Sequence, residues 1–174
     1  MKLAVAISGA SGAELGLKFI NYLPKYITPY IVISDSAKKV LKFENQKYIT
    51  YDNSQIEASI SSGSFGVDAT AIIPCSMNTL AKIACGISDN LITRVAAVAL
   101  KEQKRLLIAP REMPLSAIAL NNMQKLASLG VVISPPIIGY YANINSLEDL
   151  EKFIIGKWYD SLGIKHNLYK RWGE

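Results

Sequence analysis

A stretch near the N-terminus decides the fold, and it runs Leu3-Ala4-Val5-Ala6-Ile7-Ser8-Gly9-Ala10-Ser11-Gly12-Ala13. Its first five residues are apolar, a turn with two glycines follows at once, and Ala13–Leu23 then repeats apolar residues with a helical period. A buried strand that passes through a glycine turn into a helix is typical of open α/β sheets. Because such sheets bind ligands at the carboxyl ends of their strands, this turn is also the first candidate for a binding site.

Four more apolar runs follow along the chain, and helical patterns separate them. Nearly every position in these runs is apolar, as expected for strands that covering helices bury on both faces. We therefore predict one domain over residues 1–174, a three-layer α/β/α structure of Rossmann-like (flavodoxin-like) type with a parallel sheet. The predicted strands are Leu3–Ile7, Tyr30–Ile33, Ala69–Ile73, Leu106–Ala109 and Val131–Ile133. The predicted helices are Ala13–Leu23, a helix from near Thr79, Asn90–Gln103, Pro114–Leu129 and Leu147–Leu162.

One segment departs from this alternation of strands and helices. Residues Glu44–Gly66 are polar and rich in serine, and we predict an irregular excursion between the second and third strands. Loops of this length usually carry function, so the segment is expected to contribute to the site.

The composition fits a compact globular protein. The chain has 174 residues, of which 50% are hydrophobic and 19% are charged. A chain of this length buries roughly 70% of its unfolded surface, so it can hold a core without disulfides or a structural metal. The net charge of +5 and the pI near 9.1 attract anions, and small phosphorylated ligands satisfy such a charge. Nucleic-acid binding is disfavoured, because Lys and Arg are spread along the chain without a recognisable binding signature.

Several functional classes are disfavoured by what the sequence lacks. Cys75 and Cys85 stand ten apart without a CxxC motif, and His166 is the only histidine, so neither a zinc site nor a Ser-His-Asp triad can be assembled. The apolar residues before Ser8 are too few for a secretory signal. Other apolar stretches, such as Val95–Leu100, fall far below the ~20 residues that cross a bilayer. We therefore expect a cytoplasmic protein without a membrane partner.

The glycine turn Ser8–Ala13 carries the first binding hypothesis. Glycines let a backbone approach a phosphate, and the N–H groups of the following helix point at it, so we predict a phosphate cradle. The spacing is not GxGxxG, and the second strand ends Val32-Ile33-Ser34 without the acid that binds a ribose hydroxyl, so dinucleotide binding is disfavoured. The alternative is a tight turn in which Ser11 only caps the helix.

Polar residues also follow the next two predicted strands. Ser34 ends the second strand, and the third leads into Cys75-Ser76-Met77-Asn78-Thr79. Polar turns at three neighbouring strand ends would meet in one crevice, which makes these residues candidate ligands. Alternatively, the hydroxyl and amide groups of this run only cap the next helix. Cys75 is interpreted as a small buried apolar residue, because no base lies near it in the sequence.

Charged residues gather in the second half of the chain. Arg94 is the only charge in a long apolar helical segment, and it needs an anion or carboxylate partner if it is buried. Arg111 and Glu112 follow the fourth predicted strand between two prolines, which hold the charged pair on a rigid platform. For Lys101 and Lys104, a solvent-exposed helix face is the simpler interpretation.

Six motifs stand in order along the whole chain. They are Gly9-Ala10-Ser11-Gly12, Pro74-Cys75-Ser76-Met77-Asn78-Thr79-Leu80, Asn90-Leu91-Ile92-Thr93-Arg94, Val98-Ala99-Leu100-Lys101-Glu102, Pro110-Arg111-Glu112-Met113-Pro114 and Arg171-Trp172. Together they resemble the flavin prenyltransferase family, whose members were formerly described as aromatic acid or 3-polyprenyl-4-hydroxybenzoate carboxy-lyases. The number and order of the motifs make this resemblance far more specific than a single glycine turn.

The resemblance implies an enzyme that joins a dimethylallyl group to reduced FMN. The group is delivered as dimethylallyl phosphate and is bonded to flavin N5 and C6, which closes a fourth ring. The resemblance further implies no required metal and a homododecamer with sites at subunit contacts, with a C-terminal tail of about 163–174 packing on a neighbouring subunit. The product, prenylated FMN, would serve a partner decarboxylase of the UbiD type.

The resemblance also implies roles for individual residues. FMN would be bound by Gly9, Ala10, Ser11, Ser34, Ser76, Met77, Asn78, Thr79 and Arg111. The prenyl phosphate would be bound by Arg94, Lys101, Glu112, Tyr141 and Lys157, while Glu44 and Trp172 would line the prenyl-flavin. Of these, Ser11, Glu44, Arg94, Lys101 and Glu112 would form the catalytic set. Lys157 stands where several relatives carry Arg, which keeps the charge but loses bidentate geometry.

The residues themselves are compatible with metal-free chemistry. The chain has no DDxxD motif of the kind with which ordinary isoprenoid transferases hold metal ions. Cationic side chains such as Arg94 and Lys101 can neutralise a departing phosphate instead, while Glu112 and Ser11 pass protons. Aromatic rings, including Tyr141 and Trp172, can face an allylic cation.

Two other functions remain open from the sequence. One is an FMN-dependent decarboxylase of the phosphopantothenoylcysteine type, which uses a histidine near the first turn, whereas Ile7–Ala13 contains none. The other is a flavin-binding carrier without chemistry, in which the cations only hold phosphate.

Overall fold

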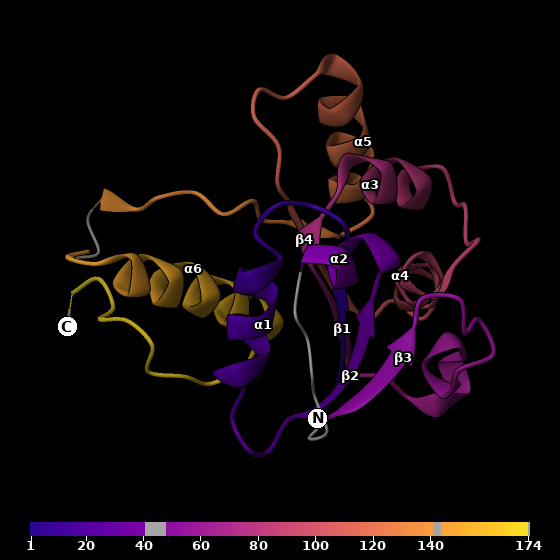
Figure 1. Ribbon diagram of the computed structural model, residues 1–174, viewed down its shortest axis with the longest axis horizontal. Helices are drawn as coiled ribbons and strands as arrows, with labels where there is room; N and C mark the ends of the chain where they lie inside the picture. The colour runs from indigo at the N-terminus through magenta and orange to yellow at the C-terminus, as the bar shows by residue number, and fades with distance from the viewer. Residues whose placement is uncertain (41–47, 141–143, 174) are drawn as a thin grey trace.

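The computed structural model describes residues 1–40, 48–140 and 144–173. These residues form a six-stranded parallel sheet with the strand order β3-β2-β1-β4-β5-β6 (Figure 1). Most of its strands are apolar runs rich in β-branched residues, which pack well on a pleated surface. The strands are β1 (Lys2–Ile7), β2 (Thr28–Ile33), β3 (Ile49–Asp52), β4 (Ala69–Cys75), β5 (Arg105–Pro110) and β6 (Val132–Ile133).

The chain reverses its direction across the sheet between β1 and β4. It leads from β1 outward to β2 and β3, and it then returns to place β4 on the other side of β1. Leu3 of β1 accordingly pairs with Pro29 of β2 and with Ala69 of β4. In open parallel sheets, such a reversal leaves a crevice at the carboxyl ends of the strands. The fold therefore puts its binding crevice beside the turn that follows β1.

Helices cover both faces of the sheet. They are α1 (Ala13–Asn21), α2 (Asp35–Val40), α3 (Met77–Ala84), α4 (Leu91–Lys101), α5 (Ala117–Ser128) and α6 (Leu147–Leu162), with the short 3-10 helices η1 (Ser59–Ser61) and η2 (Gly63–Phe65). Leu3, Val5 and Ile7 of β1 share one core with α1 and α6, while Ala4 and Ala6 share the other with α3 and α4. Among the described residues, no helix has the length and apolar character needed to cross a membrane.

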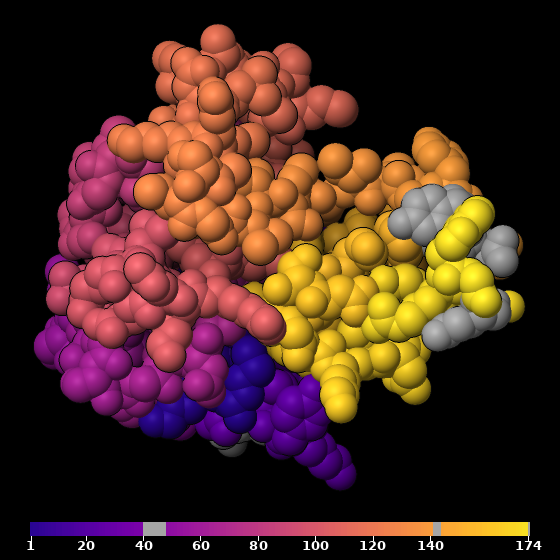
Figure 2. Space-filling model, turned by 180° about the vertical axis from the view of Figure 1, so that it is seen from behind, coloured from indigo at the N-terminus to yellow at the C-terminus, as the bar shows by residue number. Residues whose placement is uncertain are grey.

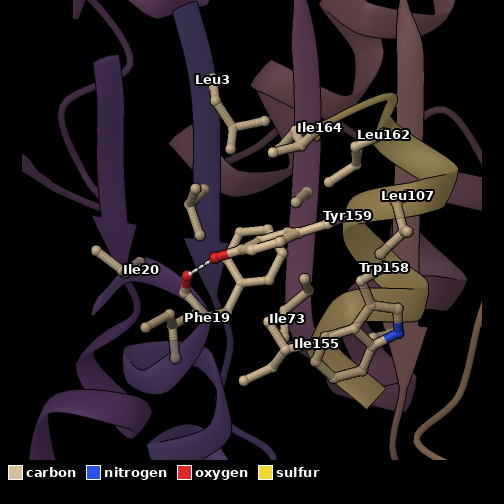
Figure 3. Close-up of a cluster of buried hydrophobic side chains, with 14 of the residues drawn as sticks. Leu3, Phe19, Ile20, Ile73, Leu107, Ile155, Trp158, Tyr159, Leu162 and Ile164 are labelled. Atoms are coloured by element: carbon tan, nitrogen blue, oxygen red, sulfur yellow. Dashed lines mark hydrogen bonds between the residues drawn. The ribbon is translucent and has the colours of Figure 1, made fainter. Parts of the chain in front are cut away.

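The core between α1 and α6 holds large aromatic side chains (Figure 3). Trp158 and Tyr159 are buried beside Phe19, and their ring centroids lie 6.3 and 4.9 Å from that of Phe19. Tyr159 Oη donates a hydrogen bond to the backbone oxygen of Phe19 at 2.5 Å, so the buried hydroxyl is satisfied. Burial raises the pKa of Tyr159. Since each fully buried large apolar side chain contributes ~1.5–3 kcal/mol, this cluster holds α6 firmly against α1.

All five predicted strands are confirmed, and the helix predicted over Leu147–Leu162 has those bounds. The helix predicted from Pro114 begins later, at Ala117, because the Ser116 hydroxyl accepts a hydrogen bond from Ala119 N and caps it. The prediction of an irregular segment over Glu44–Gly66 is wrong in part, since its described residues contain β3, η1 and η2. The sequence pattern missed β3 because this four-residue strand lies at the edge of the sheet and is largely exposed.

Candidate functional site

Ser8 joins the two turns that border the crevice. It follows β1 and is almost completely buried. Its Oγ donates to the backbone oxygen of Pro74 at 3.0 Å and accepts from the backbone N of Ser76 at 2.7 Å. The end of β1 is thereby fastened to the end of β4 where the strand order reverses. Ser8 belongs to the turn predicted as a phosphate cradle, but its role in joining the two strand ends is not predicted from the sequence.

The glycine turn has the geometry of an anion cradle. A Cβ atom on Gly9 would lie 2.5 Å from Cβ of Ser36, so only glycine fits between β1 and the start of α2. The alternative, in which Ser11 only caps α1, is wrong, because Gly12, at φ 92°, is the N-cap residue and no side chain caps the helix. The N–H groups in the first turn of α1 therefore lack a side-chain acceptor and suit a phosphate, with the exposed Ser11 beside them.

The end of β2 lies next to this turn, as the sequence predicted. Ser34 N donates to the backbone oxygen of Ile7 at 3.0 Å, and Ser34 Oγ accepts from Ala37 N at 3.2 Å. The strands β2, β1 and β4 are neighbours in the sheet. The expected convergence of three polar strand ends is therefore confirmed, and Gly9, Ala10, Ser11, Ser34 and Ser76 lie at one edge of the sheet.

The run after β4 forms the first turn of α3. Ser76 Oγ accepts from Thr79 N at 3.3 Å and donates to Thr79 Oγ1 at 3.0 Å. Ser76 therefore caps the helix, and the alternative interpretation holds for this residue of the run. Met77 is half-buried and Asn78 is exposed at the same helix end. Cys75 is buried, and burial raises the pKa of its thiol, which makes it a poor nucleophile and confirms its interpretation as a small apolar residue.

Arg111 and Glu112 follow β5 and lie beside the end of β4. Arg111 N donates to the backbone oxygen of Cys75 at 3.2 Å, which brings this loop to the same edge of the sheet as Ser76. Both side chains are exposed, and Glu112 Oε1 accepts a hydrogen bond from the backbone N of Met113 at 3.0 Å. The loop that carries Arg111 and Glu112 thus lies at the same edge of the sheet as the anion cradle, where a guanidinium can bind an anion and a carboxylate can move a proton.

Arg94 has a different partner from the expected one. It is half-buried on α4, and its Nε donates to the backbone oxygen of Ser61 in η1 at 3.2 Å. This bond ties the serine-rich segment to α4. A second tie comes from Asn53, whose Oδ1 accepts from Ile92 N at 3.0 Å in the first turn of α4. The segment after β3 is therefore held against α4, the helix that carries Arg94. This contact between the segment and the helix is not predicted from the sequence.

Lys101 lies at the opposite edge of the sheet from Glu112. It is the last residue of α4 and is exposed, and its Nζ forms an ion pair with Glu102 at 2.5 Å. The strand β5, which begins at Arg105 and ends just before Arg111, separates it from the crevice. Six residues at ~3.3 Å each amount to about 20 Å, beyond the reach of a lysine side chain. Within one chain, Lys101 therefore has the solvated position that the sequence offered as its simpler interpretation.

Two further predicted ligands lie on α6 and near the C-terminus. Lys157 is exposed on α6 and borders a cavity of about 360 Å³ between α6 and the segment after β6, lined mainly by apolar residues such as Ile133, Phe153 and Trp158. Trp172 lies near the C-terminus with 85% of its surface exposed. The predicted residues Glu44 and Tyr141 fall outside the described residues.

Comparison with known proteins shows first the class of protein to which this chain belongs and then its family. Residues 1–159 match the family model named Flavoprotein, which places the chain among the flavoproteins. The chain is 46% identical over 184 residues to flavin prenyltransferase UbiX of Campylobacter jejuni, and the match covers 99% of this chain and 98% of that protein. The chain therefore belongs to the flavin prenyltransferase family.

Solved structures show the same architecture over the whole chain. A dodecameric FMN-dependent UbiX-like decarboxylase from Escherichia coli O157:H7 superposes with a TM-score of 0.93 at 36% identity and covers 100% of both chains. AnUbiX, solved in complex with FMN and dimethylallyl pyrophosphate, gives a TM-score of 0.92 at 36% identity over 99% of this chain and 97% of that chain. The fold class predicted from the sequence is confirmed.

Proposed function

We propose that this enzyme transfers a dimethylallyl group from dimethylallyl phosphate to N5 and C6 of reduced FMN. One observation of the structure carries the proposal: the uncapped start of α1, the close approach of Gly9 to Ser36, and the charged pair Arg111 and Glu112 share one edge of the sheet. An anion cradle with an acid–base group beside it suits FMN binding together with proton transfer. The family relationship supports this choice of substrates.

The residues divide into two groups in this proposal. Gly9, Ala10 and Ser11 hold the FMN phosphate, while Ser34, Arg111 and the run Ser76, Met77, Asn78 and Thr79 hold the rest of the cofactor. Reduced FMN supplies the nucleophilic N5 atom when it is bound. The prenyl phosphate is held by Arg94, Lys101, Tyr141 and Lys157, and Glu112 and Ser11 exchange protons with it. Glu44 and Trp172 line the space for the prenyl group. No step in this scheme uses a metal ion.

Completion of the site by other copies of the chain is part of the proposal. Lys101 lies about one strand length from Glu112, so it serves a crevice in another copy. The helix α5 and the loop before it project from the body, as Figures 1 and 2 show, and large apolar side chains are exposed there. Met113, Ile118 and Leu120 are 88%, 74% and 51% exposed, respectively. Such a patch is typical of a protein–protein interface and supports assembly into an oligomer, while the dodecameric structural relative supports a homododecamer.

The decarboxylase alternative is disfavoured by the position of the single histidine. His166 is held in the C-terminal region by Asp160 at 3.0 Å and lies far along the chain from the glycine turn. A histidine-dependent decarboxylation at the crevice therefore has no histidine of this chain to use.

The product of the proposed reaction is prenylated FMN. We propose that it is released in the cytoplasm to a separate enzyme, a UbiD-type decarboxylase.

An anaerobic reaction separates the alternatives. Protein, chemically reduced FMN and dimethylallyl phosphate are mixed without added metal, and the flavin is extracted for absorbance and mass analysis. We expect a flavin heavier by one dimethylallyl group. Unchanged FMN that co-purifies with the protein would favour a carrier instead. The matched control is the Glu112→Gln variant, which should bind FMN but leave its mass unchanged.

A further inference from the structure

The C-terminal tail, residues 164–173, folds back along α6. Gly163 ends the helix at φ 73°, and the tail then runs beside α6 toward the end of the chain marked C in Figure 1. Terminal segments of this length are usually poorly ordered unless specific contacts hold them. The contacts of this tail centre on a single carboxylate of α6, that of Asp160.

Three side chains of the tail donate hydrogen bonds to Asp160. His166 Nε2 lies 3.0 Å from Oδ1, Tyr169 Oη lies 2.5 Å from Oδ2, and Arg171 Nη2 lies 2.8 Å from Oδ1. Arg171 Nη1 adds a longer bond to Oδ2 at 3.3 Å, so the guanidinium is bidentate. Both oxygens of the carboxylate thus accept hydrogen bonds from the tail, and three residues within a stretch of six, 166–171, converge on one side chain.

The imidazole of His166 is fixed by both of its nitrogens. Its side chain is only 3% exposed. Nδ1 lies 3.1 Å from the backbone N of Leu168, and because a backbone N–H can only donate, Nδ1 is the acceptor. Nε2 then carries the proton that is donated to Asp160. The ring therefore links the tail backbone to α6 in one orientation.

Gly156 provides the space in which the tail lies. A Cβ atom at this position would stand 2.4 Å from Cδ1 of Tyr169 and 2.8 Å from Cε1 of His166. The Tyr169 ring also packs edge-on against Phe153, with their centroids 5.2 Å apart. The tail is therefore held on α6 by close packing at Gly156 and Phe153 as well as by the hydrogen bonds to Asp160.

The charge of Asp160 suits its place at the centre of this cluster. Burial would raise the pKa of its carboxyl, but hydrogen bonds from Arg171, Tyr169 and His166 outweigh burial and lower the pKa to about 2. The carboxylate is therefore ionised at neutral pH, when it accepts hydrogen bonds most strongly.

We propose that Asp160 is a positioning residue that fixes the tail and thereby presents Trp172 to the prenyl-flavin site of a second copy of the chain. This inference rests on the proposed function. Trp172 directly follows Arg171, whose guanidinium is held by Asp160, yet its own side chain is 85% exposed. A large aromatic ring that an ordered tail holds outward in a single chain is placed to contact another molecule.

The experiment combines hydrogen exchange of the tail with prenyl transfer. Asp160→Asn removes the charge at nearly constant volume, and Gly156→Ala disturbs the same contact by a different route. Glu148→Gln is the matched control, because it removes a carboxylate from the same helix whose partner, Lys152, is not in the tail. We expect tail amides such as Leu168 to exchange at least about tenfold faster in the first two variants and unchanged in the control.

A double-mutant cycle with Trp172→Ala tests whether Asp160 acts through Trp172. We expect Asp160→Asn and Trp172→Ala each to lower kcat/KM for dimethylallyl phosphate by about tenfold with unchanged FMN affinity, and the double variant to lose little more. Unchanged tail exchange in Asp160→Asn would overturn the anchor. The link to Trp172 would be overturned if tail exchange is faster in Asp160→Asn but its kcat/KM is unchanged, or if the losses of kcat/KM in the two single variants add up in the double variant. A parent protein that forms no prenylated flavin refutes the proposed function and that link, while tail exchange still decides the anchor.

Discussion

Ser8 and Ser76 are joined by a 2.7 Å hydrogen bond from the backbone N of Ser76 to Oγ of Ser8. The bond spans the point at which the strand order reverses, and Ser8 Oγ also donates to the backbone oxygen of Pro74 at 3.0 Å. One buried hydroxyl thus sets the spacing between the glycine turn and the start of α3. The predicted FMN ligands on both sides depend on that spacing.

Replacing Ser8 by Ala should loosen this spacing. The backbone N–H of Ser76 would lose its acceptor near the core, which costs ~1–3 kcal/mol of folding free energy. We expect FMN affinity to fall along with stability, because the ligands at the ends of β1 and β4 would no longer be held together. Urea unfolding and FMN titration measure the two effects. Ser128→Ala, which removes an exposed hydroxyl bonded within α5, is the control and should change neither quantity.

Gly9→Ala should weaken FMN binding through a steric clash. The new methyl group would lie 2.5 Å from Cβ of Ser36, so the turn after β1 must move away from α2. Such a displacement of the cradle should cost at least about tenfold in FMN affinity, measured by calorimetry. The double variant Gly9→Ala with Ser36→Gly removes the clashing atom and should recover most of the affinity. Failure of this rescue would show that contact with Ser36 is not the reason for glycine at position 9.

The cofactor preference follows from the same turn. The sequence disfavours dinucleotides, and the structure shows one uncapped helix start beside the turn, which suits a single phosphate. We expect FMN to bind more tightly than FAD or NAD in calorimetric titrations. Tighter binding of either dinucleotide would contradict the assignment of Gly9, Ala10 and Ser11 to the FMN phosphate.

The fold was predictable because its strands carry a strong local signal. Continuous apolar runs such as Leu3–Ile7 identify the central strands, and glycine turns mark their ends. The exposed edge strand Ile49–Asp52 has no such run, so only pairing with β2 reveals it. The predicted strand Leu106–Ala109 already lies between Lys101 and Glu112, but motif order alone, which assigns both residues to one ligand, does not show that this strand keeps them apart within one chain. The tail cluster around Asp160 likewise depends on how the chain folds back after Gly163.

Acid should reduce the contribution of Asp160 to stability. Its pKa falls from an ordinary value near 3.8 to about 2 in the folded chain, so its stabilising contribution is complete above about pH 4 and is lost as the pH falls toward 2. A shift of this size corresponds to about 2 kcal/mol. Asp160→Asn should therefore be less stable than the parent at pH 7, and the difference should shrink at pH 3. Urea unfolding at both pH values and one protein concentration checks this, and a gap independent of pH would contradict it.

Lys101→Ala and Glu112→Gln should each abolish prenyl transfer while FMN stays bound. Loss of a cation that stabilises leaving-group charge typically costs on the order of 100-fold in rate, and loss of a proton-transfer group costs a similar factor. Arg111→Ala is the contrast, because this side chain is assigned to FMN and its loss should weaken cofactor binding itself. Turnover is measured with saturating reduced FMN and no added Mg²⁺. Normal turnover by both variants, or a strict Mg²⁺ requirement of the parent, would contradict the metal-free mechanism.

Mixed oligomers of these two variants test whether a site draws Lys101 and Glu112 from different chains. If it does, a random 1:1 mixture of Lys101→Ala and Glu112→Gln chains leaves both groups intact in about a quarter of the sites, and about a quarter of the parent activity should return. A 1:1 mixture of the parent with the double variant should also keep about a quarter. If both groups came from one chain, the first mixture would be inactive and the second would keep about half. Co-expression with two affinity tags yields the mixed oligomers, and the ratio of the two activities decides between the arrangements regardless of absolute turnover.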